Sequence, residues 1–154
     1  MQVRKYHSED LQIIANLFYD TIHSVNAVDY NEAQLDAWAP KDRDLFEWKN
    51  KFSNNYTVVA EKDGIIVGFG NVKGTEYFDC LYTHKDYQGI GVATLIADCI
   101  EKNFRDQGIQ NITTDASITA KHFFEKRGYL AQQEQIVECR GQLFTNFKMQ
   151  KILS

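Results

Sequence analysis

The stretch QGIGVATLI, from Gln88 to Ile96, is the part of the chain whose residue types most clearly suggest chemistry. Two glycines, Gly89 and Gly91, stand directly before an apolar pattern with helical spacing. Backbone N–H groups at the positive end of a helix attract phosphate or pyrophosphate, and glycine lets the backbone approach such a group closely. The same residues also suit a plain turn between a strand and a helix. The stretch therefore predicts either an anion-binding turn or an ordinary connection.

Two common phosphate motifs do not fit these residues. A P-loop requires a lysine after its last glycine, and no lysine follows Gly91 at that position. A dinucleotide fingerprint requires a third glycine in the first strand-helix unit, but Thr94 stands in its place and several predicted strands precede it. The remaining pattern is QxxGxA, read from Gln88 to Ala93.

The totals favour one domain, residues 1–154, because 154 residues with 44% apolar composition can bury one good core and two halves would each be marginal. The formal net charge of −4 offers no basic surface for nucleic acid, so DNA and RNA are not expected partners. A net negative protein mildly favours cationic substrates through long-range attraction.

Cys80, Cys99 and Cys139 show neither CxxC spacing nor a paired histidine, so we expect neither a disulfide framework nor a metal site. We interpret them as small buried apolar residues of a cytoplasmic protein. The N-terminus lacks the apolar core of a signal peptide, and no apolar run reaches the roughly 20 residues of a membrane helix. We therefore expect no membrane association.

The elements that would position the glycines follow from periodicity. Helical spacing predicts helices behind Ser8 as N-cap, after the Asn31/Gln34 capping box, around Leu45 to Phe52, from Val92 to a C-cap at Gly108, and through AKHFFEKRGY. Strands are predicted at 3–6, as a hairpin in YTVVAEKDGIIVGFGNV, at YFDCLYT, and near 111–115, 132–139 and 143–150. The order predicts an α+β fold with a mixed sheet.

At this point the sequence resembles a known family. The run LYTHKDYQGIGVA is similar to the acetyl-coenzyme A motif of the GCN5-related N-acetyltransferases, with Thr83 in place of valine and Lys85 in place of proline. The later run SITAKHFFEKRGY is similar to the second block of that family, with Ser117 in the asparagine place. The resemblance covers essentially the whole chain and is closest to a bacterial subgroup. It implies a mixed, mostly antiparallel central sheet of about seven strands, flanked by helices.

The resemblance implies acetyl-CoA as cosubstrate and assigns its contacts. Backbone groups of the strand before the glycines would pair with the pantetheine arm, and the amides after it would hold the pyrophosphate. Lys85, Lys121 and Lys126 are candidate phosphate partners, although each also suits a solvated surface. The implied coenzyme-binding residues are Leu81, Tyr82, Thr83, Gln88, Gly89, Ile90, Gly91, Val92, Ala93, Thr94, Ser117 and Phe124.

The implied reaction is direct attack of an amine on the thioester. An alkyl amine with a pKa of about 10.4 is almost wholly protonated at pH 7, so a general base or a water relay to one is expected. Asp79 is the first candidate, because it lies on the strand beside the expected thioester. The alternative is a strand-end carboxylate that faces solvent or pairs with a lysine. Glu138 is a weaker candidate.

The departing thiolate would be protonated by a tyrosine of the second block in many members of the family, and here that place holds Phe124. Tyr129 is a candidate substitute, with core packing as the alternative, and His122 is a weaker one. A backbone N–H near Leu81 would stabilise the oxyanion.

The function that these features favour is acetyl transfer to a primary amine of a small molecule or peptide. One alternative is an acyl-CoA-binding sensor or pseudoenzyme with little turnover, and another is an adaptor in which the glycine turn is only structural. The acceptor would be selected by residues 25–54 and the last two strands. Trp38 and Trp48 could line an amine pocket or pack in the core. We also consider a homodimer.

Overall fold

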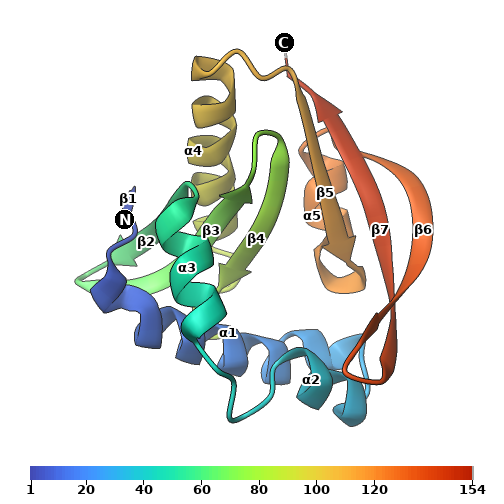
Figure 1. Cartoon of the computed structure of the whole chain (residues 1–154). Helices are drawn as coiled ribbons and strands as arrows, with labels where there is room; N and C mark the ends of the chain where they lie inside the picture. Colours follow the sequence, from blue (N-terminus) through green and yellow to red (C-terminus); the bar gives the residue numbers. More distant parts are fainter. Residues whose placement is uncertain (154) are drawn as a thin grey trace.

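One seven-stranded sheet organises the chain (Figure 1). The computed structural model describes residues 1–153. The strands are β1 (Gln2–Lys5), β2 (Thr57–Lys62), β3 (Ile65–Lys73), β4 (Tyr77–Thr83), β5 (Asn111–Ser117), β6 (Leu130–Cys139) and β7 (Gln142–Ile152). The α-helices are α1 (Leu11–Ser24), α2 (Glu32–Trp38), α3 (Phe46–Asn54), α4 (Val92–Asp106) and α5 (Ile118–Lys126), with short 3₁₀ turns η1 (Ser8–Asp10) and η2 (Asn26–Val28).

The strand order is β1-β2-β3-β4-β5-β7-β6. All neighbours are antiparallel except β4 and β5, which run parallel and share a single paired position, Tyr77 with Thr113. The predicted α+β fold with a mostly antiparallel sheet is therefore confirmed. The sheet consists of a four-strand half and a three-strand half that touch at one end of their shared edge.

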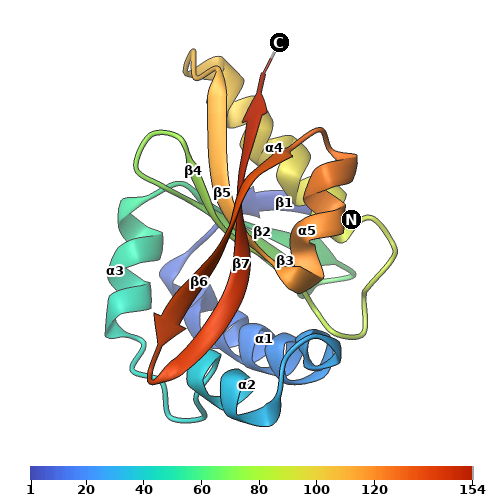
Figure 2. The ribbon, with the colours of Figure 1, turned by 90° about the vertical axis from the view of Figure 1, so that its right-hand side faces the viewer.

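The helices cover both faces of the sheet (Figure 2). One core forms under α4 and α5, with Ile96, Ile100 and Phe124 among its buried residues. A second core forms under α1, α2 and α3, with Ile14 and Phe52 among its members. Each helix thus buries one apolar face against the sheet, as its periodicity predicts.

Helix α4 sits unusually close to β3. A Cβ at Gly68 would lie 2.7 Å from Val92 Cγ1, and a Cβ at Gly70 would lie 2.6 Å from Ile96 Cγ2. Both distances are shorter than side chains tolerate, so glycine at these two strand positions is what lets α4 pack there. The first turn of α4 is thereby fixed beside the end of β4.

Most predicted elements are confirmed, and their ends differ by a few residues. The Asn31/Gln34 capping box is present, with Gln34 N–H donating to Asn31 Oδ1 at 2.9 Å. The prediction of Ser8 as an N-cap is wrong, because Ser8 lies inside η1 and the Asp10 carboxylate accepts the N–H of His7 instead. Among the described helices, none combines the length and apolar character that crossing a bilayer requires.

Candidate functional site

The site begins where β4 and β5 part. Their pairing stops after Tyr77 and Thr113, and the Thr114 hydroxyl donates to the Phe78 carbonyl at 2.7 Å. On the other edge of β4, Cys80 pairs with Asn71 and Phe78 pairs with Val72, so Asp79 is the extra residue of a β-bulge. Beyond this bulge, β4 turns away from β5 and leaves backbone groups without a strand partner.

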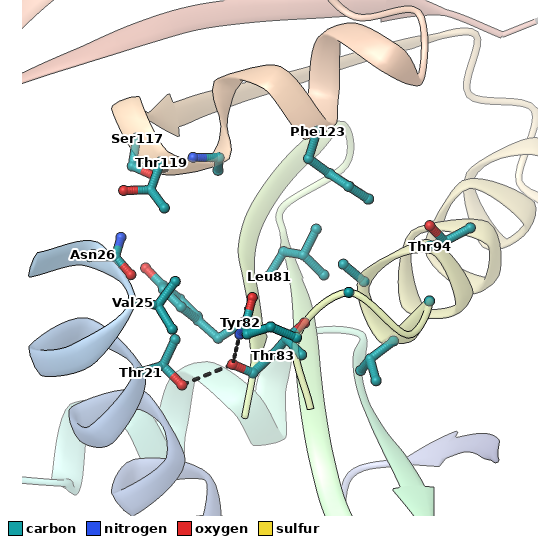
Figure 3. Close-up of a pocket in the computed structure, with 16 residues that line it drawn as sticks. Thr21, Val25, Asn26, Leu81, Tyr82, Thr83, Thr94, Ser117, Thr119 and Phe123 are labelled. Carbon is teal, nitrogen blue, oxygen red and sulfur yellow. Dashed lines mark hydrogen bonds between the residues drawn. The ribbon is translucent and has the colours of Figure 1, made fainter. Parts of the chain in front are cut away.

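The first cavity, which we call the loop cleft, has a volume of about 270 Å³ (Figure 3). It lies between the end of β4, the start of α4, the end of α1 and the start of α5. Its lining residues are Thr21, Val25, Asn26, Leu81, Tyr82, Thr83, Gln88, Gly89, Gly91, Val92, Ala93, Thr94, Ser117, Thr119, Ala120 and Phe123.

The loop from Gln88 to Gly91 presents backbone donors to this cleft. Gly89 and Gly91 have φ of +74° and +93°, a left-handed conformation that glycine adopts without strain. A Cβ at either glycine would meet nothing within 4 Å, so this conformation, rather than crowding, requires glycine. Within residues 1–153, the N–H groups from Gly89 to Thr94 have no protein partner. They form a row of free donors at the positive end of α4, which suits an anion.

The edge of β4 offers a second set of backbone groups. The Thr83 carbonyl faces the cleft, where it accepts from the Thr21 hydroxyl at 2.9 Å and from Gln88 Nε2 at 2.8 Å (Figure 3). Leu81, two residues earlier, presents its backbone to the same side because strand groups alternate. The Tyr82 carbonyl faces β3, 3.0 Å from the position of a Cβ on Gly68. The Leu81 backbone and the Thr83 N–H therefore provide the open edge, because the Thr83 carbonyl already has two donors. The predicted backbone role of Tyr82 does not fit.

Helix α5 contributes a different aromatic from the predicted one. Ser117 caps the helix by accepting the Ala120 N–H at 3.1 Å and also lines the loop cleft. Phe123 lines the cleft, whereas Phe124 is 4% exposed and packs edge-on against Phe78 and Tyr129. Phe124, predicted to bind the coenzyme, does not line the loop cleft but does line the small cavity between β4 and β5, because successive helical residues face different sides. Ile90 is exposed and does not line the cleft.

Two further cavities continue from the loop cleft. A junction cavity of about 60 Å³ lies in the opening between β4 and β5 and is lined by Asp79, Tyr82, Asp115 and Ser117, among others. The next cavity, which we call the aromatic pocket, has a volume of about 280 Å³ and is lined by Tyr30, Trp38, Tyr77, Tyr82, Asp115, Ser117, Val137, Cys139, Phe144, Thr145 and Asn146. Tyr82 and Ser117 line all three cavities, so the three adjoin one another at these two residues.

Comparisons with known proteins agree with this geometry. The model of the acetyltransferase (GNAT) domain family matches residues 26–151. The chain is 34% identical over 149 residues to YafP of Escherichia coli (strain K12), described as an uncharacterized N-acetyltransferase, and the match covers 97% of this chain and 94% of YafP. The chain belongs to the GNAT acetyltransferase family.

Solved structures of this family share the fold. A GCN5-related N-acetyltransferase from Rhodopseudomonas palustris is 38% identical, with a TM-score of 0.95 over 99% of this chain and 95% of that chain. The PaiA N-acetyltransferase of Thermoplasma acidophilum, solved in complex with coenzyme A, has a TM-score of 0.82 at 18% identity, with 98% of each chain covered. The protein is an acetyl-CoA-dependent N-acetyltransferase.

The residues of the loop cleft fit the coenzyme of this GNAT enzyme. Free N–H donors at the start of α4 match the phosphates, and the open edge of β4 matches an amide-bearing arm. Of the three candidate lysines, Lys121 lies over the Phe147 ring at 4.4 Å, Lys85 is 3.5 Å from Asp86, and Lys126 lines a separate surface hollow. None of the three lines the loop cleft.

Asp79 lies in the junction cavity with an ion-pair partner. Its Oδ2 is 2.5 Å from Lys51 Nζ, and its side chain is 15% exposed. Burial disfavours the charged form of Lys51, but Cys80 and Asp79 outweigh it, so the pKa of Lys51 is raised. Burial also raises the pKa of the Cys80 thiol to about 12, which keeps it protonated. The sequence suggested a lysine partner only as the alternative to a catalytic role for Asp79. In the structure, Asp79 pairs with Lys51 and also lines the junction cavity.

Tyr129 lies outside all three cavities of the GNAT site. It is 1% exposed, and its hydroxyl donates to Glu101 Oε2 at 2.9 Å beneath α4. Arg127 and Lys151 donate to the same carboxylate at 3.0 and 2.8 Å. Its prediction as a catalytic acid does not fit this placement, because the hydroxyl belongs to a buried ion cluster. Glu138 and His122 are exposed and line neither the loop cleft nor the aromatic pocket.

Several site residues were not anticipated from the sequence. Thr21, Val25 and Asn26 reach the cleft from the end of α1, and Asp115 and Asn146 line the aromatic pocket from β5 and β7. Thr21 and Asn26 are polar residues at buried positions, which is the only signal that the sequence gives for them. Residues 1–153 hold no group of three or more His, Cys, Asp or Glu side chains placed to bind a metal ion.

Proposed function

We propose that this acetyltransferase moves the acetyl group of acetyl-CoA directly to a primary amine of a small molecule or peptide, within a single domain that covers residues 1–154. The observation that carries the proposal is that Tyr82 and Ser117 line all three cavities. A backbone-lined cleft for one substrate thereby meets a side-chain-lined pocket for the other at one point.

The coenzyme would enter by the loop cleft. We place its pyrophosphate on the free N–H groups from Gly89 to Thr94 and its pantetheine arm along the open edge at Leu81 and Thr83. The thioester would then lie at the junction cavity. The Leu81 N–H is the donor placed to stabilise the oxyanion that forms there.

The acceptor amine would reach the thioester from the aromatic pocket. It must lose a proton before or during attack, since an alkyl ammonium has no free electron pair. Asp79 and Asp115 are the two carboxylates that line the junction cavity, and we propose Asp79, the more buried of the two, as the base, directly or through a water. Lys51 holds it in place beside the parting of β4 and β5.

The structure also offers an acid for the departing thiolate. Tyr82 lines all three cavities, and burial, followed by Cys80 and Asp79, raises the pKa of its hydroxyl. The group therefore remains a proton donor at neutral pH. We propose that the Tyr82 hydroxyl is the acid that protonates the departing thiolate, in place of Phe124 and Tyr129.

The test is release of free coenzyme A thiol from acetyl-CoA in the presence of a panel of primary amines, combined with calorimetric titration of acetyl-CoA. Amine-dependent release with a matching acetylated product supports the proposal. Tight binding without release from any amine or peptide would instead indicate an acyl-CoA sensor. Absence of binding would indicate a protein adaptor with a structural glycine turn.

A further inference from the structure

The aromatic pocket has the composition of a site for a positively charged group. Of the described residues that line it, Asp115 is the only one with a formal charge, and five are aromatic. We infer that the acceptor is a dibasic amine, in which one amino group is acetylated and a second cationic group is held at Asp115. The inference rests on the proposed function, since it specifies the acceptor of that reaction.

The aromatic rings form a packed wall. Tyr30, Trp38 and Phe144 contact one another, with ring centroids 5.3 Å apart for Tyr30 and Trp38 and 5.9 Å apart for the other two pairs. The Tyr30 hydroxyl is fixed as well, because it accepts the Ile118 N–H at 2.9 Å. A rigid wall of this kind attracts a cation through the negative faces of its rings.

Asp115 is an exposed carboxylate that lines this pocket. Its two oxygens accept from the Tyr77 hydroxyl at 2.7 Å and from Gln135 Nε2 at 3.0 Å, and both donors are neutral. Burial and the adjacent carboxylate raise the pKa of Tyr77, so its hydroxyl stays protonated. Lys148 is the cross-strand partner of Asp115, but within residues 1–153 it makes no ion pair with it. The carboxylate is thus positioned but not neutralised.

Asn146 supplies an acceptor that the protein leaves unused. Its Oδ1 is buried and has no hydrogen-bond partner among the described residues, although an unpaired buried acceptor is unfavourable. Asn146 lines the aromatic pocket and lies directly opposite Ser117 across β7 and β5. An N–H of a bound amine would satisfy this oxygen, so the ligand is expected to bring a donor to this side of the pocket.

Attack on the thioester and binding to a carboxylate require amino groups in different charge states, so we infer two nitrogens in the acceptor. The attacking nitrogen must be neutral, whereas a carboxylate in contact stabilises the charged form of an amine. Asp115 therefore suits a nitrogen that stays charged and does not attack. Asp115 lines both the aromatic pocket and the junction cavity, so a cationic group held there lies close to the attacking nitrogen. The acceptor class is therefore a short terminal diamine.

The experiment compares two acceptors of equal length with saturating acetyl-CoA. One is diaminobutane with an amino group at each end, and the other is pentylamine, which has a methyl group in place of the second nitrogen. We expect kcat/KM for the diamine to be about two- to fivefold higher, because a contact with an exposed carboxylate contributes at most about 1 kcal/mol. In Asp115→Asn the preference should fall to near parity through KM, and Asp115→Glu should restore part of it. Glu125→Gln, an exposed carboxylate change on α5, is the matched control and should keep the full preference.

The outcomes separate this inference from the proposed function. Equal use of both amines by the wild type, or a diamine preference that survives Asp115→Asn, would overturn the inference while acetylation of amines stands. Titration of each amine into the complex with coenzyme A measures binding without turnover. Diamine binding that depends on Asp115, without thiol release, would support the cation site and overturn the proposed reaction. Neither binding nor release would overturn both.

Discussion

The loop cleft and the aromatic pocket are built in opposite ways. The cleft takes most of its lining from one contiguous segment, Leu81 to Thr94, and the groups that it offers to a ligand are largely backbone N–H and C=O. The pocket is assembled from four distant segments, and it offers rings, a carboxylate and an amide. A backbone site depends on local conformation, whereas a side-chain site depends on how the whole sheet is folded.

This difference matches the two ligands. One cosubstrate is common to the family, and the backbone cradle that we propose for it does not depend on particular side chains. The acceptor differs between enzymes, and side chains can be exchanged without disturbing the cradle. The two regions meet only at Tyr82 and Ser117, so substitutions on one side should leave binding on the other side intact.

The largest effect is expected from Gly91→Asp. The change forces a side chain into a left-handed backbone position and places a carboxylate beside the phosphates, so affinity for acetyl-CoA should fall more than about a thousandfold. Calorimetric titration measures it, and thermal unfolding checks the fold. Gly91→Asn is the matched control, with the same shape and no charge, and should lose less. Unchanged affinity in Gly91→Asp would contradict the proposed cradle.

Asp79→Asn tests the proposed general base, which lines the junction cavity between the loop cleft and the aromatic pocket. We expect kcat at pH 7 to fall about a hundredfold, and less at pH 9, because the free amine is commoner there. The KM for acetyl-CoA should change little. Lys51→Gln breaks the same ion pair but keeps the carboxylate, so it should retain more activity. An equal loss at both pH values would exclude Asp79 as the base.

Glu101→Gln tests the buried ion cluster that holds α4, the helix whose first turn forms part of the loop cleft. Burial alone would raise the pKa of Glu101, but hydrogen bonds from Arg127 and Lys151 outweigh it, and the pKa lies below its usual range. A lowered folded pKa stabilises the protein above the unfolded value of about 4.3, and this stability is lost as pH falls through the folded pKa. The variant should lose about 2 kcal/mol in urea unfolding at pH 7.

The difference in the free energy of unfolding between the wild type and Glu101→Gln should become smaller as the pH falls. Below the folded pKa of Glu101 the wild type no longer has the charged contact, so the two proteins should converge in stability. A difference that does not change with pH would show that packing, not charge, makes the contribution. Acetyl-CoA affinity of the folded variant at pH 7 should match the wild type, because Glu101 does not line the loop cleft.

The smallest effect is expected from Tyr82→Phe. Protonation of a thiolate with a pKa of about 8.5 is worth about 2 kcal/mol at pH 7, and water can perform it in part. We therefore expect about a tenfold lower kcat with little change in either KM, measured by thiol release. Phe104→Leu, in the core under α4 and outside the three cavities, is the comparison that should change stability but not the pH profile of kcat. An unchanged kcat in Tyr82→Phe would remove it as the acid.

The loop cleft was the more predictable region for a physical reason. Glycines before a helix pattern indicate a local backbone conformation, and Gly89 and Gly91 adopt it regardless of what packs around them. The strands at YFDCLYT and the helix from Val92 were equally clear, because their patterns are local. Fold and cradle were therefore predictable from short stretches.

The remaining site residues depend on contacts between distant segments. Phe123 and Phe124 are neighbours in sequence, and only the rotation of α5 against the sheet decides which one faces the cleft. Tyr129 is directed to Glu101 by the packing of α4. Asp115 and Asn146 enter one pocket only because β5 pairs with β7. Periodicity contains none of this information.

The strand order also has a consequence for the time course of synthesis. Strand β6 precedes β7 in the chain, yet its sole strand neighbour in the sheet is β7, which lies between β5 and β6. A growing chain that has reached residue 139 already contains every lining residue of the loop cleft, while β6 still has no partner. The ribosome thus completes the segments of the cradle first. The aromatic pocket is completed later, when β7 supplies Phe144, Thr145 and Asn146.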